Sequence, residues 1–131
     1  MISSLHRFHG YTSLSYAYKQ GRSVRSGQLA MRYVLNRRRS KYRAAVIVSR
    51  KVDKSAVVRN RIRRRVYEII RACAGEITEP YDIAFTIFTN QLADISSAQL
   101  QRQVRECLAK ANIITSVKPP SHAIVSAKDK R

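Results

Sequence analysis

The sequence predicts an α+β fold, a two-layer sandwich in which helices cover a small mixed sheet. Residues 28–35 and 82–89 alternate apolar side chains with a period of two, and 43–49 is a short apolar run, as in strands. Residues 55–74 and 96–111 instead repeat apolar residues every three or four positions, as in helices with one buried face. A chain of 131 residues with 44% hydrophobic residues is long enough for one domain with one core.

The first part of the chain is expected to contain one short helix and one strand. Thr12 or Ser13 is suited to cap a helix that runs to about Lys19, and Gly21 is suited to end it. The strand at 28–35 points two sets of side chains to opposite faces: Leu29, Met31 and Tyr33 to one, and Ala30, Arg32 and Val34 to the other.

Two further strands are expected to join this one. A charged turn at 37–41 leads from 28–35 into 43–49, and the simplest arrangement of those two strands is an antiparallel pair. Residues 23–26 can add a short strand at the edge. A helix separates 43–49 from the strand at 82–89, and this strand–helix–strand order predicts that the two pair in parallel.

Capping residues place the ends of the two long helices. Asp53 or Ser55 is the N-cap candidate of the first helix, and Gly75 follows its expected end. Ser96 or Ser97 is suited to begin the second.

The expected domain covers residues 1–117, and residues 118–131, which end in AKDKR, are expected to be a basic, disordered tail. Cys73 and Cys107 form no motif and lie on the predicted helix stripes, so we expect reduced core residues of a cytosolic protein. The sequence has no apolar run of 18 residues and no apolar signal region in its first ten residues. We therefore expect neither a transmembrane helix nor a secretory signal, and a cytoplasmic location.

The net charge of +18 is concentrated in the first 71 residues. They hold 19 Lys and Arg against 2 acids, a balance of +17, while the rest of the chain holds 7 against 6, a balance of +1. A charge of this kind predicts one surface that binds a polyanion, with strongly salt-dependent affinity. A membrane surface is also anionic, but the basic helix has no exposed Trp or Phe on a free apolar face, so no membrane partner is expected.

The stretch from Lys54 to Arg71 carries most of this charge. It holds seven cations, six of them arginines, against the single acid Glu68. Val58, Ile62 and Val66 form the apolar stripe of the helix, and the arginines occupy its other sides. Like charges one turn apart destabilise a helix, and planar guanidinium groups are suited to bidentate contact with phosphate. A solvated basic surface is the alternative, but so dense an arginine cluster favours a nucleic-acid surface.

Two motifs in this region resemble those of a known family. Val48–Ser49–Arg50–Lys51–Val52, followed by AVVRNRIRR at 56–64, resembles the signature of bacterial ribonuclease P protein subunits, and weaker similarity runs from about Leu14 to Leu108. The resemblance implies the element order αβββαβα, with a left-handed β-α-β crossover around the basic helix, as in the ribosomal protein S5 domain 2-like fold.

The residues themselves offer no catalytic set. The acids are scattered, the histidines lie near the two ends, and no zinc spacing or phosphate-binding glycine loop occurs, so we expect no catalytic or metal-binding residue. The resemblance implies an endoribonuclease whose RNA subunit catalyses with Mg²⁺ that the RNA holds. The protein would bind that RNA and precursor tRNA, and would assist removal of the 5′ leader.

The resemblance also implies roles for particular residues. Those expected to bind RNA are Arg50, Lys51, Arg59, Asn60, Arg61, Arg63, Arg64 and Arg71. Those expected to line a groove for the 5′ leader are Leu14, Tyr18 and either Arg32 or Tyr33, with Tyr33 favoured because its ring can stack on a base. The chain departs from the family at Leu14, where an aromatic residue is common, at Asp53, where Gly is usual, and at Tyr67, where Arg is usual.

Three other functions are compatible with parts of the pattern. A ribosomal or other structural RNA-binding protein fits the composition equally well, and only the two ordered motifs argue against it. A helix-turn-helix DNA reader needs a second helix just before the basic one, where a strand is predicted instead, so DNA is not an expected partner. A stand-alone nuclease lacks the clustered carboxylates that would hold its metal ions.

Overall fold

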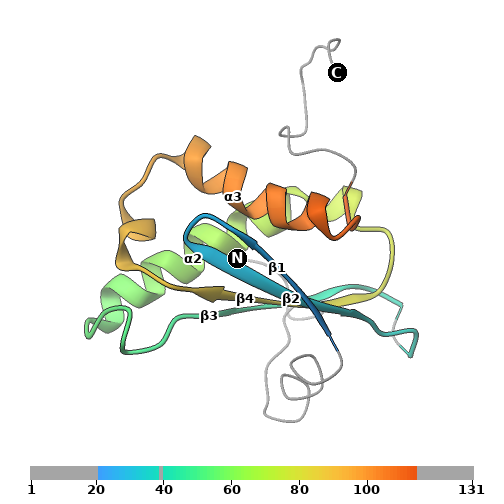
Figure 1. Ribbon diagram of the computed structural model, residues 1–131, viewed down its shortest axis with the longest axis horizontal. Coiled ribbons are helices and arrows are strands. Elements are labelled where there is room, and N and C mark those ends of the chain that lie inside the picture. Colours follow the sequence, from blue (N-terminus) through green and yellow to red (C-terminus); the bar gives the residue numbers. More distant parts are fainter. Residues whose placement is uncertain (1–20, 39, 115–131) are drawn as a thin grey trace.

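The computed structural model describes residues 21–38 and 40–114, which form a four-stranded sheet with two helices on one of its faces (Figure 1). The elements are β1 (Arg22–Ser26), β2 (Leu29–Leu35), β3 (Arg43–Ile47), α2 (Ala56–Ala72), the 3₁₀ turn η2 (Ala74–Glu76), β4 (Tyr81–Ile87), the 3₁₀ turn η3 (Asn90–Ala93) and α3 (Ser97–Lys110). This confirms the α+β, two-layer prediction. The expected helix at 12–19 and the expected tail at 118–131 lie outside the described residues, and the left-handed crossover stays a prediction.

The strands lie in the order β1-β2-β4-β3. β3 and β4 pair in parallel, which confirms the prediction from the strand–helix–strand order, and β1 is the expected edge strand, antiparallel to β2. The predicted antiparallel pair of β2 and β3 is wrong, because β4 lies between them and takes β2 as its antiparallel neighbour. Both β3 and β4 bury side chains on their two faces, but β4 has seven residues against five in β3 and pairs with β2 along the whole length of both strands, which gives the longer ladder of hydrogen bonds.

The core lies between the helices and one face of the sheet, called here the helix face. On this face Met31 of β2 is the register partner of Phe85 of β4, which in turn is paired with Val46 of β3. The stripes of α2 and α3 complete this core with Ile62, Val66, Ile70, Leu100, Val104 and Leu108, all of them buried. Full burial of one such side chain contributes about 1.5–3 kcal/mol, so the sandwich is held mainly by this layer.

Local hydrogen bonds fix the helix ends. The Ser55 hydroxyl caps α2 by accepting from the Val58 N–H, and the Ser96 hydroxyl caps α3 by accepting from the Gln99 N–H. The helix α2 ends before Gly75, at the cap residue Cys73. Asn112, just after α3, has a φ of 60°, a left-handed conformation that Asn tolerates better than most residues.

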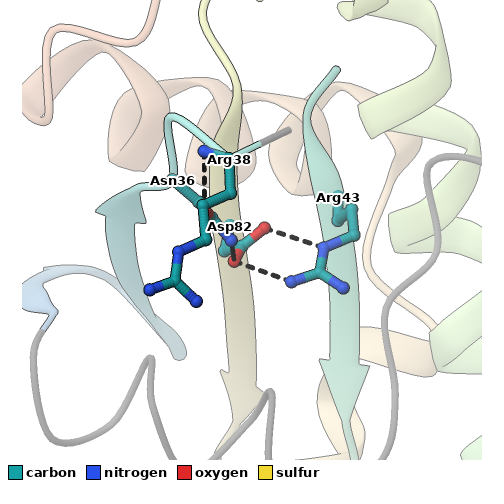
Figure 2. Close-up of polar contacts among 4 residues, drawn as sticks. All are labelled: Asn36, Arg38, Arg43 and Asp82. Carbon is teal, nitrogen blue, oxygen red and sulfur yellow. Dashed lines mark hydrogen bonds and ion pairs between the residues drawn. The ribbon is translucent and has the colours of Figure 1, made fainter. Parts of the chain in front are cut away.

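The opposite face of the sheet, called here the second face, carries alternate residues of the same strands. Ala45 and Ala84 are buried there, with Val34 and Ile47 packed against them. At one end of the face the Asp82 carboxylate is 1% exposed and accepts hydrogen bonds from Arg43 Nε (2.9 Å), Arg43 Nη2 (2.8 Å) and Asn36 Nδ2 (2.9 Å) (Figure 2). These contacts tie the start of β3 to β4 and to the residue that follows β2.

Both cysteines are buried free thiols, as the sequence predicts. Cys73 Sγ accepts a hydrogen bond of 2.9 Å from Nη1 of Arg105, a buried arginine of α3 whose Nη2 also pairs with Glu76 at 3.0 Å. This links the end of α2 to α3. Within residues 21–38 and 40–114, no helix has the length and the apolar content needed to cross a bilayer.

Candidate nucleic-acid interface

Exposed cations gather where β3 leads into α2. Arg50, Lys51 and Lys54 are all exposed in the connection, and the first turn of α2 that follows contains no acidic residue. A helix N-terminus carries a partial positive charge, which adds to the charge of these side chains. The junction therefore combines three free-standing cations with a helix end that favours an anion.

Asp53 orders this connection from within. Its two carboxylate oxygens accept hydrogen bonds from the Ser55 N–H at 2.8 Å and from Asn90 Nδ2 at 3.1 Å. Arg59 adds two bonds of 3.0 Å from its Nη1 to the backbone oxygens of Asp53 and Lys54. The family departure at Asp53 thus has a structural role, because it fixes the loop that presents the exposed cations.

Some of the predicted RNA-binding arginines are occupied by the protein itself. Arg63 Nη1 donates to Oδ1 of Asn60 at 2.5 Å, and its Nη2 donates to the Val48 carbonyl oxygen at 3.4 Å. Arg63 is half-buried, as is Arg59, whereas Asn60 is exposed. The backbone contacts mean that Arg59 and Arg63 hold the strand-to-helix connection in place.

A second pair of arginines anchors the loop after β4. Arg61 Nε donates to the Ala93 carbonyl oxygen at 2.9 Å, and Arg65 donates to the carbonyl oxygens of Leu92 and Ile95 at 2.7 and 2.6 Å. Charged donors make stronger hydrogen bonds than neutral ones, and these three acceptors lie within or just after η3. Arg65 therefore positions η3 against α2, a role that the sequence pattern does not indicate.

Arg64 and Arg71 differ from that group because they point to solvent. Arg64 is exposed, and within the described residues no hydrogen bond or ion pair holds its guanidinium. Arg71 is also exposed but pairs with Glu68 at 2.9 Å, one turn before it. Arg64 is thus the helix arginine most available to a phosphate, and Arg71 has part of its charge already balanced.

The residues expected to line a leader groove are divided by the structure. Leu14 and Tyr18 lie outside the described residues. Arg32 and Tyr33 are neighbours on β2 and point to opposite faces, with Arg32 opposite Ala84 on the second face and Tyr33 opposite Ile83 on the helix face. Tyr33 also meets Tyr81 edge to face, with ring centroids 6.2 Å apart, in a hollow of about 360 Å³ near the end of α3.

Tyr67, another of the three family departures, belongs to the core. Its side chain is buried, and its hydroxyl accepts a hydrogen bond of 3.2 Å from the Val46 N–H. Because β3 is an edge strand, the outward N–H groups of its backbone have no strand partner, and Tyr67 satisfies one of them. Among the described residues, no three His, Cys, Asp or Glu side chains are grouped as metal ligands.

Comparison with known proteins gives a matching family model and named relatives. The family model described as Ribonuclease P matches residues 3–112. The ribonuclease P protein component of Roseiflexus castenholzii is 38% identical over 96 residues, covering 73% of this chain and 77% of the relative. That of Chloroflexus aurantiacus is 36% identical over 108 residues, covering 82% of this chain and 76% of the relative.

Solved structures share the fold. An RNase P protein structure from Staphylococcus aureus superposes with a TM-score of 0.74 at 24% identity, covering 84% of this chain and 98% of that one. One from Thermotoga maritima superposes with a TM-score of 0.71 at 20% identity, covering 80% and 96%. Because the family model spans most of the sequence and the curated relatives share over a third of the aligned residues, this chain belongs to the ribonuclease P protein component family.

Proposed function

We propose that this chain acts in tRNA processing as the protein subunit of a ribonuclease P endoribonuclease, binding the RNA subunit and the 5′ leader of precursor tRNA. The observation that carries the proposal is the cluster of exposed cations at the β3–α2 junction, Arg50, Lys51 and Lys54, continued along α2 by Arg64. These groups are suited to phosphates because no intramolecular acid neutralises them within the described residues.

The proposed division of labour gives the protein binding and orientation. Arg59, Arg61, Arg63 and Arg65 hold the two loops beside α2, so that the exposed cations keep a fixed spacing against the RNA subunit. Hydrolysis of the phosphodiester is assigned to the RNA subunit, which would hold the Mg²⁺ ions that supply the metal chemistry. No protein side chain is given a catalytic role, and the cytoplasmic location stays a prediction.

For the leader groove, the second face of the sheet is favoured over the helix face. The helix face is filled by α2 and α3, and Tyr33 packs against that core. Arg32 lies on the second face, which α2 and α3 do not cover (Figure 1). An extended strand of RNA needs a face that these helices leave uncovered. We therefore assign the position on β2 to Arg32 rather than to the Tyr33 favoured from the sequence.

The experiment is cleavage of precursor tRNA by a ribonuclease P RNA, with and without this protein, at low Mg²⁺ and physiological salt. Stimulation that grows with a 5′ leader of several nucleotides is the expected result. A protein that binds structured RNA tightly but gives no stimulation would instead be a structural RNA-binding protein, the alternative that the composition allows. The variant Arg64→Ala, compared with the exposed but ion-paired control Arg71→Ala, reports whether the stimulation depends on the free helix arginine.

A further inference from the structure

One aromatic side chain on the second face has no place in the core. Phe88 follows β4 and is 48% exposed, whereas Phe85 of the same strand is fully buried. Its backbone N–H is held by the Gln28 carbonyl oxygen at 3.1 Å, so its position at the end of the sheet is fixed by the strand ladder. Phe88 and Val57 are the large hydrophobic side chains left exposed among the described residues, and of these two Phe88 is the one with an aromatic ring.

A cation already stacks on this ring. The guanidinium carbon of Arg25 on β1 lies 4.5 Å from the Phe88 ring centroid, within the range of a cation–π contact. Arg25 Nε also donates to the Gly27 carbonyl oxygen at 3.4 Å, which ties the guanidinium to the β1–β2 turn. The two side chains form a preordered pair, called here the Arg25–Phe88 platform, which offers flat faces and a positive charge.

The platform lies on the same face of the sheet as Arg32. Arg25 pairs in register with Ala30, and Arg32 pairs with Ser23, so both arginines project from the second face two residues apart along the β1–β2 ladder. Phe88 reaches the same face because it alternates with Ile87, which points into the core. A chain that crosses this face past Arg32 would therefore meet the platform next.

From this arrangement we propose that the Arg25–Phe88 platform stacks a nucleobase of single-stranded RNA, extending the proposed leader groove beyond Arg32 to the end of β4. The inference rests on the proposed function for the identity of the RNA, the 5′ leader. The stacking itself depends only on the two side chains. A base has a π-face that stacks on an aromatic ring or on a guanidinium plane, and its phosphate is attracted by the same arginine. The net charge of +18 and the arginine stacked on the exposed ring favour an anionic strand as the occupant.

The chain has no tryptophan, so Phe88→Trp gives a single reporter at the platform. Its emission, excited where tyrosine does not absorb, is measured against a single-stranded RNA decamer and against an abasic decamer with the same phosphates. Quenching by the first and not by the second is expected, because only a base can stack. Ala72→Trp, at an exposed position at the end of α2, is the matched reporter and should show no base-dependent quenching.

Binding of the same two oligonucleotides to Phe88→Ala and Phe88→Tyr supplies a second readout. The alanine variant should bind the decamer about tenfold more weakly and the abasic decamer as before, while tyrosine should restore wild-type affinity. The salt dependence of binding to Phe88→Ala should match wild type, because no ionic contact is removed. Equal quenching by both oligonucleotides, or wild-type affinity in Phe88→Ala, would overturn the inference.

The test of the platform and the test of the proposed function can fail independently of each other. If the wild-type protein stimulates precursor cleavage and the Phe88 readouts fail, only the platform is lost. If it gives no stimulation but Phe88→Trp shows base-dependent quenching, the platform stands as a single-strand site and the ribonuclease P role is rejected.

Discussion

Arg43 and Asp82 form a bidentate ion pair between the two parallel strands of the sheet. Arg43 Nε and Nη2 lie 2.9 and 2.8 Å from the two Asp82 carboxylate oxygens, and the two residues are direct register partners (Figure 2). The parallel pair closes only after α2 has crossed between β3 and β4, so this contact joins segments about forty residues apart. It fixes the register at the start of β3, and hence where the β3–α2 junction begins.

Asp82→Asn is expected to destabilise the free protein by about 3 kcal/mol, since it removes the buried negative charge from the bidentate pair with the largely buried Arg43 guanidinium. The matched control is Arg71→Ala, which breaks an exposed pair with Glu68 and should cost less than about 1 kcal/mol. Urea unfolding followed by circular dichroism measures both. A loss for Asp82→Asn no larger than for the control would show that the backbone ladder alone fixes the register.

Much of the fold is predictable from local pattern. Period-two alternation locates β2 and β4, a 3.6-residue period locates α2 and α3, and the hydroxyls of Ser55 and Ser96 mark the two helix starts as expected. The neighbours of β4 are harder to predict, because β3 and β4 both bury side chains on their two faces and local pattern alone does not select the central strand. The one local difference is length, since YDIAFTI has the seven residues needed to pair with all of β2, whereas RAAVI has five.

The candidate site is predictable in composition but not in the role of each residue. The arginines of α2 are adjacent in sequence, yet the groups that occupy Arg61 and Arg65 are carbonyl oxygens of residues 92–95, about thirty positions away. The helical period of the sequence does not predict partners so distant along the chain. Likewise the alternation along β2 separates Arg32 from Tyr33, but only the packing of α2 and α3 tells which of the two faces is filled.

Replacing Arg64 is predicted to affect RNA binding, and replacing Arg65 is predicted to affect stability. Arg64→Ala should lower the slope of log affinity against log salt by about one unit and leave thermal stability unchanged, because its guanidinium holds no described residue. Arg65→Ala should lower stability by about 1–3 kcal/mol, because it leaves the carbonyl oxygens of Leu92 and Ile95 without their donor.

Salt titrations of RNA binding and thermal unfolding of both variants test this division. A reduced salt slope for Arg65→Ala with unchanged stability would place Arg65 at the RNA rather than at η3.

Arg32→Ala and Tyr33→Ala distinguish the two faces of β2. Arg32→Ala should weaken the binding of precursor tRNA more than the binding of mature tRNA, since only the precursor carries a leader that can cross the second face. Tyr33→Ala should instead lower stability and affect both RNAs alike, because Tyr33 packs on the core and against Tyr81. Affinities for the two RNAs, measured side by side, decide the matter. A selective loss of precursor binding in Tyr33→Ala would show that the leader binds on the helix face, at Tyr33, and not on the second face.

Alkaline pH is expected to destabilise the free protein through groups that fold in their neutral forms. Burial raises the pKa of the Cys107 thiol to about 12, mainly by desolvation of the thiolate, against 9.0 for an ordinary thiol. Burial likewise raises the pKa of Tyr42 from 10.0 to about 12. A pKa that is higher in the folded state means that the folded chain keeps a proton which the unfolded chain releases, so the stabilisation is complete below the unfolded pKa and is lost above it.

The free energy of unfolding should therefore fall between about pH 9 and pH 12, with each such group adding up to about 1.4 kcal/mol per pH unit in its window. Urea unfolding at successive pH values measures this slope. Cys107→Ala, which removes one of the groups, should be less stable at pH 7 because it leaves a small cavity, yet should lose less stability between pH 9 and pH 12. A slope equal to that of the wild type would show that the pKa of the Cys107 thiol is the same in the folded and unfolded states, so that this thiol contributes nothing to the alkaline transition.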